Sequence, residues 1–251
     1  MDKINKSLHS LSTRMQTGNS LSKSEPSAKP SVCHECNGQR YYAYDVEFGH
    51  PYFGQLFPCP VCNQIAIDSA CGLKTHERSI TLDALKTSGR IGTAKMIEAA
   101  TRFISKPRGF LSLHGRFGNG KTTVLMAIVN GVINNGTKAR YLTASELLSY
   151  LRETFNNETK ESDYDRIHEL AKIPVLCIDE MDKLRDTPYS REIQQELINL
   201  RYRDAGVLGT VLAWNGELDS LPWPAVVSRL SEFTVIRNDD SDMRKLIGGV
   251  Q

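Results

Sequence analysis

Short apolar runs alternate with helical patterns along the C-terminal two thirds of the chain. Runs of strand length, bounded by polar or turn-forming residues, are Phe110–His114, Ala139–Thr143, Val175–Ile178, Thr210–Trp214 and Glu232–Ile236. The clearest helical patterns between them are Thr122–Asn134, Ser145–Phe155 and Arg191–Asp204. Strands that alternate with helices in this way predict an α/β fold, a parallel sheet with helices on both faces.

The same pattern divides the chain into zones. Residues 1–31 contain eight serines, two prolines and few large apolar residues, which predicts a flexible tail. Residues 32–65 are rich in cysteine and aromatic side chains and predict a small separate module. We expect a helical linker at 66–102, the α/β domain at 103–237 and a polar C-terminal tail at 238–251.

Composition and charge exclude few classes of function. Hydrophobic residues make up 40% of the chain, charged residues 24%, and the net charge is +2, a balance that neither requires nor excludes a nucleic-acid partner. No apolar run approaches the roughly 20 residues that cross a bilayer, and the N-terminus lacks the apolar stretch of a signal peptide. We therefore expect a cytoplasmic protein with no membrane partner, whose six cysteines are metal ligands or free thiols.

The segment GRFGNGKTT, Gly115–Thr123, follows the first predicted strand and opens a helical pattern. This context predicts a P-loop, in which backbone N–H groups at a helix N-terminus bind the phosphates of ATP. Lys121 is expected to reach the β- and γ-phosphates, and the Thr122 hydroxyl to ligate Mg²⁺. A chance glycine-rich turn is the alternative. The expected nucleotide contacts are Gly115, Gly118, Asn119, Gly120, Lys121, Thr122 and Thr123.

An acidic pair ends the apolar run VLCIDE, Val175–Glu180. Carboxylates at the carboxyl end of a buried parallel strand lie at the sheet edge where ligands bind. We expect Asp179 to hold Mg²⁺ through water and Glu180 to orient the attacking water. An exposed Asp-Glu helix cap is the alternative.

Two later residues are further catalytic candidates beside Lys121, Asp179 and Glu180. Asn215 follows the strand pattern TVLAWN, where its amide could position water or touch the γ-phosphate; a plain turn residue is the alternative. Arg229 lies between the helix start after Pro224 and the last strand. An arginine there could complete a neighbouring subunit's active site, because its guanidinium stabilises charge on the phosphates. A surface ion pair is the competing interpretation.

Two C-x-x-C motifs, Cys33–Cys36 and Cys59–Cys62, are separated by 22 residues. Four thiolates at this spacing predict a structural Zn²⁺ site in a zinc-ribbon-like module, and a redox pair would not explain two motifs. Seven aromatic residues lie between the motifs. They are interpreted as a protein-docking surface, a base-stacking surface or cover for the zinc site, with docking favoured because few basic residues accompany them.

The order of these motifs resembles the AAA+ ATPases of the DnaC/DnaI helicase-loader and IstB group over roughly Phe103–Ile236. The motifs are GRFGNGKTT, YLTASELLSYLRETF, VLCIDE, ELINLRYRDAG, TVLAWN and VVSRL. The resemblance implies an AAA+ P-loop NTPase core that lacks a full C-terminal lid, with Asn215 as the sensor asparagine and Arg229 as an arginine finger. Ala213-Trp214 departs from the Thr-Ser usual in this group. Arg201-Tyr202 falls where the group tends to show an Arg-Tyr pair.

Loaders of the DnaI type carry an N-terminal zinc module, whereas IstB-type proteins generally do not. The resemblance therefore implies an ATP-dependent replicative-helicase loader that docks on a hexameric helicase, contacts single-stranded DNA and self-associates into an ATP-dependent oligomer. An IstB-type transposition helper acting on duplex DNA is the alternative. A third interpretation is a zinc-dependent adaptor with a vestigial ATPase. The intact Lys121, Thr122 and Asp179-Glu180 argue against it.

Overall fold

The chain forms two compact units, Met1–Ala66 and Ile67–Gln251, which are treated separately below. The tail expected at 1–31 lies outside the described residues. A computed structural model of the chain describes residues 33, 36–39, 41–43, 47–48, 53–54, 56–59, 71–153, 162–183 and 186–243.

The N-terminal unit contains a small β-ribbon. Its strands β1 (Tyr41–Tyr42) and β2 (Phe57–Pro58) pair in antiparallel register. A tight turn follows Cys36, where Asn37 and Gly38 both take positive φ angles of 48° and 81°. The Gln39 N–H donates to the Cys36 carbonyl at 2.9 Å, so the chain turns back on itself directly after this cysteine.

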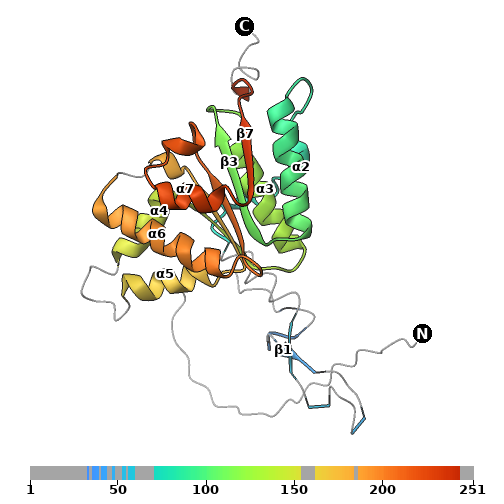
Figure 1. Cartoon of the computed structure of the whole chain (residues 1–251). Coiled ribbons are helices and arrows are strands. Elements are labelled where there is room, and N and C mark those ends of the chain that lie inside the picture. The colour runs from blue at the N-terminus through green and yellow to red at the C-terminus, as the bar shows by residue number, and fades with distance from the viewer. Residues whose placement is uncertain are drawn as a thin grey trace, which may run out of the picture. The chain divides into compact units, whose positions relative to one another are not determined.

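The C-terminal unit is built on a five-stranded sheet of order β4-β5-β6-β3-β7 in which every pairing is parallel (Figure 1). The strands are β3 (Gly109–Gly115), β4 (Ala139–Thr143), β5 (Val175–Asp179), β6 (Gly209–Ala213) and β7 (Thr234–Asn238). The predicted parallel α/β sheet is therefore confirmed. Strand β7 begins two residues later than predicted, because the Phe233 N–H donates to the Leu230 carbonyl and closes the preceding helix.

Helices cover both faces of this sheet, with α2 and α3 on one side and α4 to α7 on the other (Figure 1). Their bounds are α2 (Ile91–Ser105), α3 (Lys121–Asn134), α4 (Ala144–Arg152), α5 (Asp163–Ala171), α6 (Pro188–Arg203) and α7 (Pro224–Leu230). Short 3-10 turns lie at Thr75–Glu77, Leu82–Ala84, Met181–Lys183 and Leu218–Ser220. Within the described part of the chain, every helix is too short or too polar to span a bilayer.

The sheet separates two hydrophobic cores, and the strands alternate their side chains between them. Along β6, Val211 and Ala213 pack into the core under α2 and α3. Leu212 and Trp214 pack into the core under α4 to α7. Burial on both faces explains why the inner strands read as continuous apolar runs in the sequence.

Helix α2 and the segment after β7 belong to this folded unit. The expected linker boundary at 103 falls inside α2, which packs against α3 and β7. Asp240, expected in a polar tail, accepts hydrogen bonds from the Gly92 N–H at 3.2 Å and from the Thr93 N–H and hydroxyl at 2.7 Å each. The buried Arg90 donates to the Ser241 carbonyl at 2.7 Å. Residues 238–243 therefore cap and anchor the start of α2.

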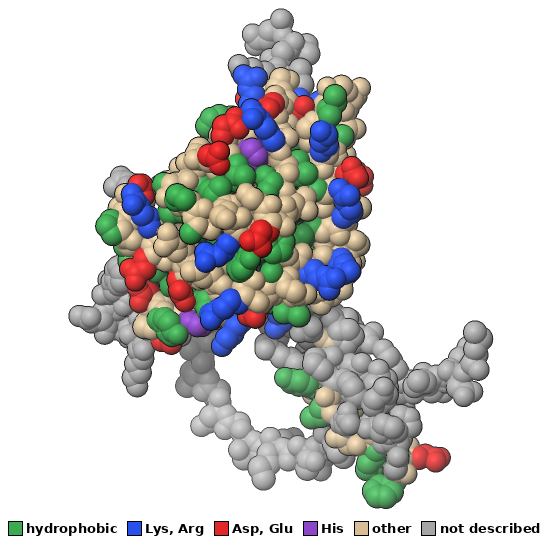
Figure 2. Space-filling view, viewed as in Figure 1, with side chains coloured by type: hydrophobic (Ala, Val, Ile, Leu, Met, Phe, Trp, Pro, Cys, Tyr) green, Lys and Arg blue, Asp and Glu red, His purple; other side chains and the backbone are tan. Residues whose placement is uncertain are grey.

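Charged side chains on the C-terminal unit are mixed in sign. On the face shown in Figure 2, lysine and arginine are interspersed with aspartate and glutamate. This distribution agrees with the small net charge of +2.

Candidate nucleotide-binding site

The P-loop lies between the end of β3 and the start of α3. Gly115, Gly118 and Gly120 have φ angles of 124°, 70° and 92°, which favour glycine over any residue with a Cβ. At Gly115 a Cβ would lie 2.1 Å from the Asn238 carbonyl oxygen, so a side chain has no room there. Gly120 is the N-cap of α3, so the loop leads directly to free N–H groups at the positive end of a helix.

The end of β7 and the residues that follow it hold the loop in place. The Asn238 carbonyl accepts the Arg116 N–H at 3.0 Å and the Asn119 Nδ2 at 2.5 Å. The Met243 N–H donates to the Gly118 carbonyl at 2.8 Å. Asn119 is fully buried, so its side chain holds the loop itself in shape.

The Lys121 side chain is folded back against the loop. Its Nζ donates to the Arg116 carbonyl at 2.7 Å, to Asn119 Oδ1 at 3.0 Å and to the Gly115 carbonyl at 3.4 Å. Burial lowers the pKa of Lys121 to about 8, although the charges of Asp179 and Asp182 act in the opposite direction.

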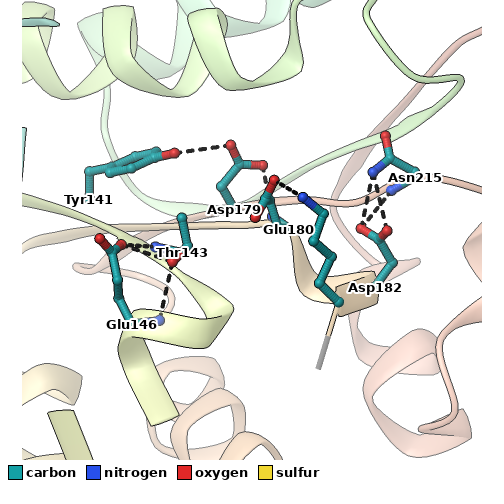
Figure 3. Close-up of polar contacts among 8 residues, drawn as sticks. Tyr141, Thr143, Glu146, Asp179, Glu180, Asp182 and Asn215 are labelled. Atoms are coloured by element: carbon teal, nitrogen blue, oxygen red, sulfur yellow. Dashed lines mark hydrogen bonds and ion pairs between the residues drawn. The ribbon is translucent and has the colours of Figure 1, made fainter. Parts of the chain in front are cut away.

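Asp179 is buried at the end of β5 and makes contact with the first residues of α3. Its Oδ2 accepts a 3.1 Å hydrogen bond from the Tyr141 hydroxyl (Figure 3), and the Thr122 side chain also bonds the carboxylate. Burial raises the pKa of Asp179, while the bonds from Thr122, the Glu180 N–H and Tyr141 lower it. Burial also raises the pKa of Tyr141, so its hydroxyl remains a donor. The adjoining hydroxyl and carboxylate are oxygen ligands of the type that Mg²⁺ prefers.

Glu180 has an unusual backbone conformation. With φ of 58° it is, with Asn37, one of two non-glycine residues at positive φ among the described residues. Such a conformation costs about 1–3 kcal/mol and is found most often at functional positions. The Glu180 carboxylate pairs with Lys183 Nζ, and the Lys183 N–H donates to the Glu180 carbonyl at 2.9 Å.

Asn215 follows β6, which is next to β3 in the sheet. The Gly216 N–H donates to the Gly115 carbonyl at 3.1 Å, so this turn touches the start of the P-loop. Trp214 is fully buried, donates its Nε1 to the Glu217 carbonyl at 3.0 Å and stacks on His114 with 5.4 Å between ring centroids. Trp214 is therefore a core residue that fixes the turn. The Asn215 side chain itself is bonded to Asp182 (Figure 3).

A cavity of about 340 Å³ joins these groups. Lys121, Thr122, Asp179, Glu180 and Asn215 all line it. Its remaining wall includes three residues that sequence reasoning missed, namely the apolar Ala84, Leu85 and Met243. Polar groups on one side and an apolar wall on the other suit a nucleotide, whose phosphates are charged and whose base is flat and largely apolar.

Arg229 lies in α7 and packs against α6. Its Nη1 donates to Asn199 Oδ1 at 2.5 Å, and its guanidinium lies 5.5 Å from the centroid of the Tyr202 ring. The Tyr202 hydroxyl donates to Glu232 Oε2 at 2.6 Å. The arginine is thus half-buried on the α6–α7 surface, apart from the residues that line the nucleotide cavity of its own chain.

Arg201, the residue before Tyr202, stabilises the fold and does not line the cavity. It is fully buried, and its guanidinium donates to the carbonyls of Leu170, Ala171, Ile173 and Gly209 and to the Thr210 hydroxyl. Burial lowers the pKa of Arg201 to about 10. The residue ties α5, the chain before β5, and β6 together.

The cysteines of the N-terminal unit converge. The Sγ atoms of Cys33, Cys36 and Cys59 all lie within 4.8 Å of one another, and Cys36 and Cys59 are buried. Cys62, the fourth expected ligand, lies outside the described residues. Thiols from two separate motifs that meet at one point form a donor set that fits Zn²⁺.

Part of the chain is similar in sequence to a known ATPase family and to several known proteins. Residues 111–237 match the family described as "ATPase family associated with various cellular activities (AAA)". The chain is 25% identical over 126 residues to the replicative helicase loader DnaC of Buchnera aphidicola subsp. Schizaphis graminum (strain Sg), covering 48% of this chain and 51% of that protein. It is 30% identical over 141 residues to the insertion sequence IS5376 putative ATP-binding protein of Geobacillus stearothermophilus, covering 54% and 55%.

The chain thus spans about half the length of the curated relatives it matches. A crystal structure of the DnaC helicase loader superposes with a TM-score of 0.57 at 17% identity, over 66% of this chain and all of that one, which shows a shared fold. These relatives confirm the resemblance to the helicase-loader and IstB-like group. The matched region covers just over half of the chain and includes the P-loop, the Asp179–Glu180 strand end and Arg229, so the chain belongs to the ATPase family associated with various cellular activities.

Proposed function

We propose that the chain is an ATP-dependent replicative-helicase loader, which docks on a hexameric helicase and helps to place it on single-stranded DNA. The observation that carries the ATPase part is the cavity that gathers Lys121, Thr122, Asp179, Glu180 and Asn215. The loader part is supported by relatives that carry the name replicative helicase loader.

In this proposal, each group of the cavity has one task. The P-loop N–H groups and Lys121 bind the phosphates, and Thr122 and Asp179 hold Mg²⁺, which when bound neutralises charge on the β- and γ-phosphates. Glu180 orients the attacking water after it separates from Lys183. Asn215 turns its amide to the γ-phosphate or to that water.

Two substitutions separate binding from turnover. Lys121→Ala should abolish ATP binding, because the phosphates lose their cation. Glu180→Gln should keep binding and reduce turnover by roughly 10²–10⁴-fold, the range for a general base or water-orienting group. Calorimetric titration with ATP and a phosphate-release assay measure the two effects. Retained ATP affinity in Lys121→Ala would reject the P-loop assignment.

For the N-terminal unit we propose a structural Zn²⁺ held by Cys33, Cys36, Cys59 and Cys62. The purified full chain should contain close to one zinc per molecule by elemental analysis. Cys36→Ser should lose most of the metal, because three thiolates bind Zn²⁺ more weakly than four. Cys71→Ala, which removes a buried cysteine from the other unit, is the matched control and should keep it. Zinc retained in Cys36→Ser would contradict the ligand set.

The loader role can be tested directly with the full chain, ATP, closed circular single-stranded DNA and the hexameric replicative helicase of the source cell. The wild-type chain should co-purify with the helicase and increase the amount bound to the circle. Cys36→Ser should lose co-purification, while Lys121→Ala should keep it and lose loading. Equal loading with and without the chain would reject the proposal.

The second candidate is an IstB-type transposition helper that acts on duplex DNA. The 30% identity to the insertion-sequence protein favours it. The two candidates differ in their nucleic-acid preference, so ATP turnover should be measured with duplex and with single-stranded DNA of equal length. Stimulation by duplex alone, together with failure to bind the helicase, would favour the transposition helper.

A further inference from the structure

Asp182 engages the side chain expected to sense the nucleotide. It lies in the 3-10 turn Met181–Lys183, directly after the acidic pair. Its Oδ1 accepts the Asn215 backbone N–H at 3.0 Å, and Asn215 Nδ2 lies 3.3 Å from Oδ1 and 3.1 Å from Oδ2 (Figure 3). The Asp182 carboxylate thus binds both the backbone N–H and the side-chain amide of Asn215.

This contact fixes the orientation of the Asn215 amide. An ionised carboxylate only accepts hydrogen bonds, so the Nδ2 end of the amide has to face Asp182 and the Oδ1 end has to face away from it. A phosphate oxygen also only accepts hydrogen bonds. Asp182 therefore engages the NH₂ group, the donor end of the amide, that a γ-phosphate would also have to use.

Asp182 also places negative charge near the phosphate site. Burial lowers the pKa of Lys121, and the charges of Asp179 and Asp182 partly reverse that effect, so the field of Asp182 reaches the P-loop lysine. A triphosphate brings one more charged group toward Asn215 than a diphosphate does. Repulsion from Asp182 should therefore act on ATP more than on ADP.

The backbone holds Asp182 in this place. Met181, its neighbour, is buried in the core under α4 to α7 and anchors the turn. On the other side, the Lys183 N–H closes the turn on the Glu180 carbonyl. Glu180 enters the turn at a φ of 58°, so the segment is fixed at both ends.

We propose that Asp182 sets the preference of this site between ATP and ADP, because it competes with the γ-phosphate for the Asn215 amide. The inference rests on the proposed ATPase function. ATP binding then requires Asn215 to leave Asp182, whereas ADP leaves the contact intact. Asp182 is a positioning residue that acts through Asn215.

The test compares the affinities of the full chain for Mg²⁺-ADP and for Mg²⁺ with the non-hydrolysable analogue adenylyl imidodiphosphate, by calorimetric titration. Asp182→Ala should bind the triphosphate analogue roughly tenfold more tightly, since a hydrogen bond to a charged group no longer has to be broken. Its ADP affinity should stay within about twofold of the wild type. Asp182→Asn, which removes the charge and keeps an acceptor, should show a smaller gain.

Two further variants make the result specific. In an Asn215→Ala background, Asp182→Ala should no longer change the preference, because the shared contact is already absent. Asp219→Ala removes another exposed carboxylate after β6 and should leave both affinities unchanged. Thermal unfolding of each variant shows that the fold is kept.

The outcomes are distinguishable. An unchanged ratio of affinities, or weaker binding of the triphosphate analogue by Asp182→Ala, would overturn the competition. The same would follow if the gain persisted in the Asn215→Ala background. Failure of the wild-type chain to bind either nucleotide would instead reject the proposed ATPase, and the role of Asp182 with it.

Discussion

At the scale of single residues, the charge of Lys121 depends strongly on its surroundings. Burial lowers its pKa to about 8, well below the usual value of 10.5. Phosphate binding favours the protonated ammonium. Nucleotide binding above pH 8 should therefore take up a proton, and the affinity for ATP should fall as the pH rises through about 8.

This pH dependence is measured by calorimetric titration between pH 7 and pH 9.5, in buffers that differ in ionisation enthalpy. Affinity should drop by up to about tenfold per pH unit at the alkaline end, with proton uptake approaching one. Lys121→Arg stays charged over this range and should show no such uptake if it binds. A flat profile in the wild-type chain would show that Lys121 keeps its proton without the nucleotide.

Tyr141 acts on the expected metal site through Asp179. Tyr141→Phe removes one of the hydrogen bonds that lower the pKa of Asp179, so that pKa should rise further. Loss of such a supporting bond typically weakens metal binding by 10–100-fold. The Mg²⁺ concentration for half-maximal ATP turnover should rise by at least about tenfold, and more at pH 6 than at pH 8, because protons then compete with the metal.

Tyr150→Phe is the matched control for Tyr141→Phe. Its hydroxyl donates to Glu169 at 2.9 Å, away from the cavity residues. This variant should leave the Mg²⁺ requirement unchanged. Equal Mg²⁺ requirements for both variants would remove Tyr141 from the site.

At the scale of secondary-structure elements, α2 depends on a cap supplied from the other end of the C-terminal unit. Asp240→Ala removes the acceptor for the Gly92 and Thr93 N–H groups and should lower the free energy of unfolding by about 1–2 kcal/mol. Urea unfolding measures this loss. Asp239→Ala, which removes an exposed ion pair with Arg237, should cost clearly less, because solvent screens such a pair.

The Asp240 effect should also depend on pH. Burial alone would raise the pKa of Asp240. The hydrogen bonds from Thr93 and Gly92 lower it by more, so the pKa falls below its usual 3.8. The folded-state pKa is depressed, so the stabilisation is present above about pH 3.8 and is lost as the pH falls toward the folded value. The difference between wild type and Asp240→Ala should shrink over that acid range. A difference that is constant with pH would contradict an ionic cap.

The elements predicted from the sequence were those with strong local signals. The three inner strands β3, β5 and β6 are largely apolar, and they and the edge strand β4 were located to within about one residue. Helix α5 was missed, because the nine residues after its Ser162 cap contain few large apolar side chains and are stabilised by packing on α6. Helix α2 was assigned to a linker, since the sequence alone does not show its packing on β7.

The same distinction holds for the site. The P-loop and the Asp179–Glu180 pair are contiguous motifs, so the sequence alone was enough to propose them. Tyr141 reaches Asp179 only through the pairing of β4 with β5, and Leu85 reaches the cavity only through the path of the chain before α2. No local sequence pattern reveals either placement. The Asp182–Asn215 contact joins residues 33 positions apart and could not be predicted either.

At the scale of the whole molecule, the predicted arginine-finger role of Arg229 can be tested together with the proposed self-association. It is tethered to Asn199 and Tyr202 on the α6–α7 surface, apart from the cavity of its own chain. We expect Arg229→Ala to leave ATP affinity within about twofold of the wild type. In this variant the ATP turnover per subunit should no longer rise with protein concentration. At high concentration it should be up to roughly 10³-fold below that of the wild type, the lower end of the range for an arginine finger.

The measurement is the ATP turnover per subunit across a dilution series, with and without DNA. Arg203→Ala, an exposed arginine at the end of α6, is the matched control and should keep the concentration dependence. If Arg229→Ala kept it as well, the finger role would be rejected. If turnover were independent of concentration in the wild-type chain, the proposed self-association would be rejected instead.

The hydrogen bonds to the Asn238 carbonyl have a practical consequence for anyone who shortens this chain. The family match ends at residue 237, which makes that position an obvious place to cut a gene fragment. Such a fragment would encode every sequence motif of the nucleotide site and would still lack the acceptor for the Arg116 N–H and the Asn119 side chain. We therefore expect it to express with weakened nucleotide affinity, and fragments meant for binding studies should extend to at least residue 243.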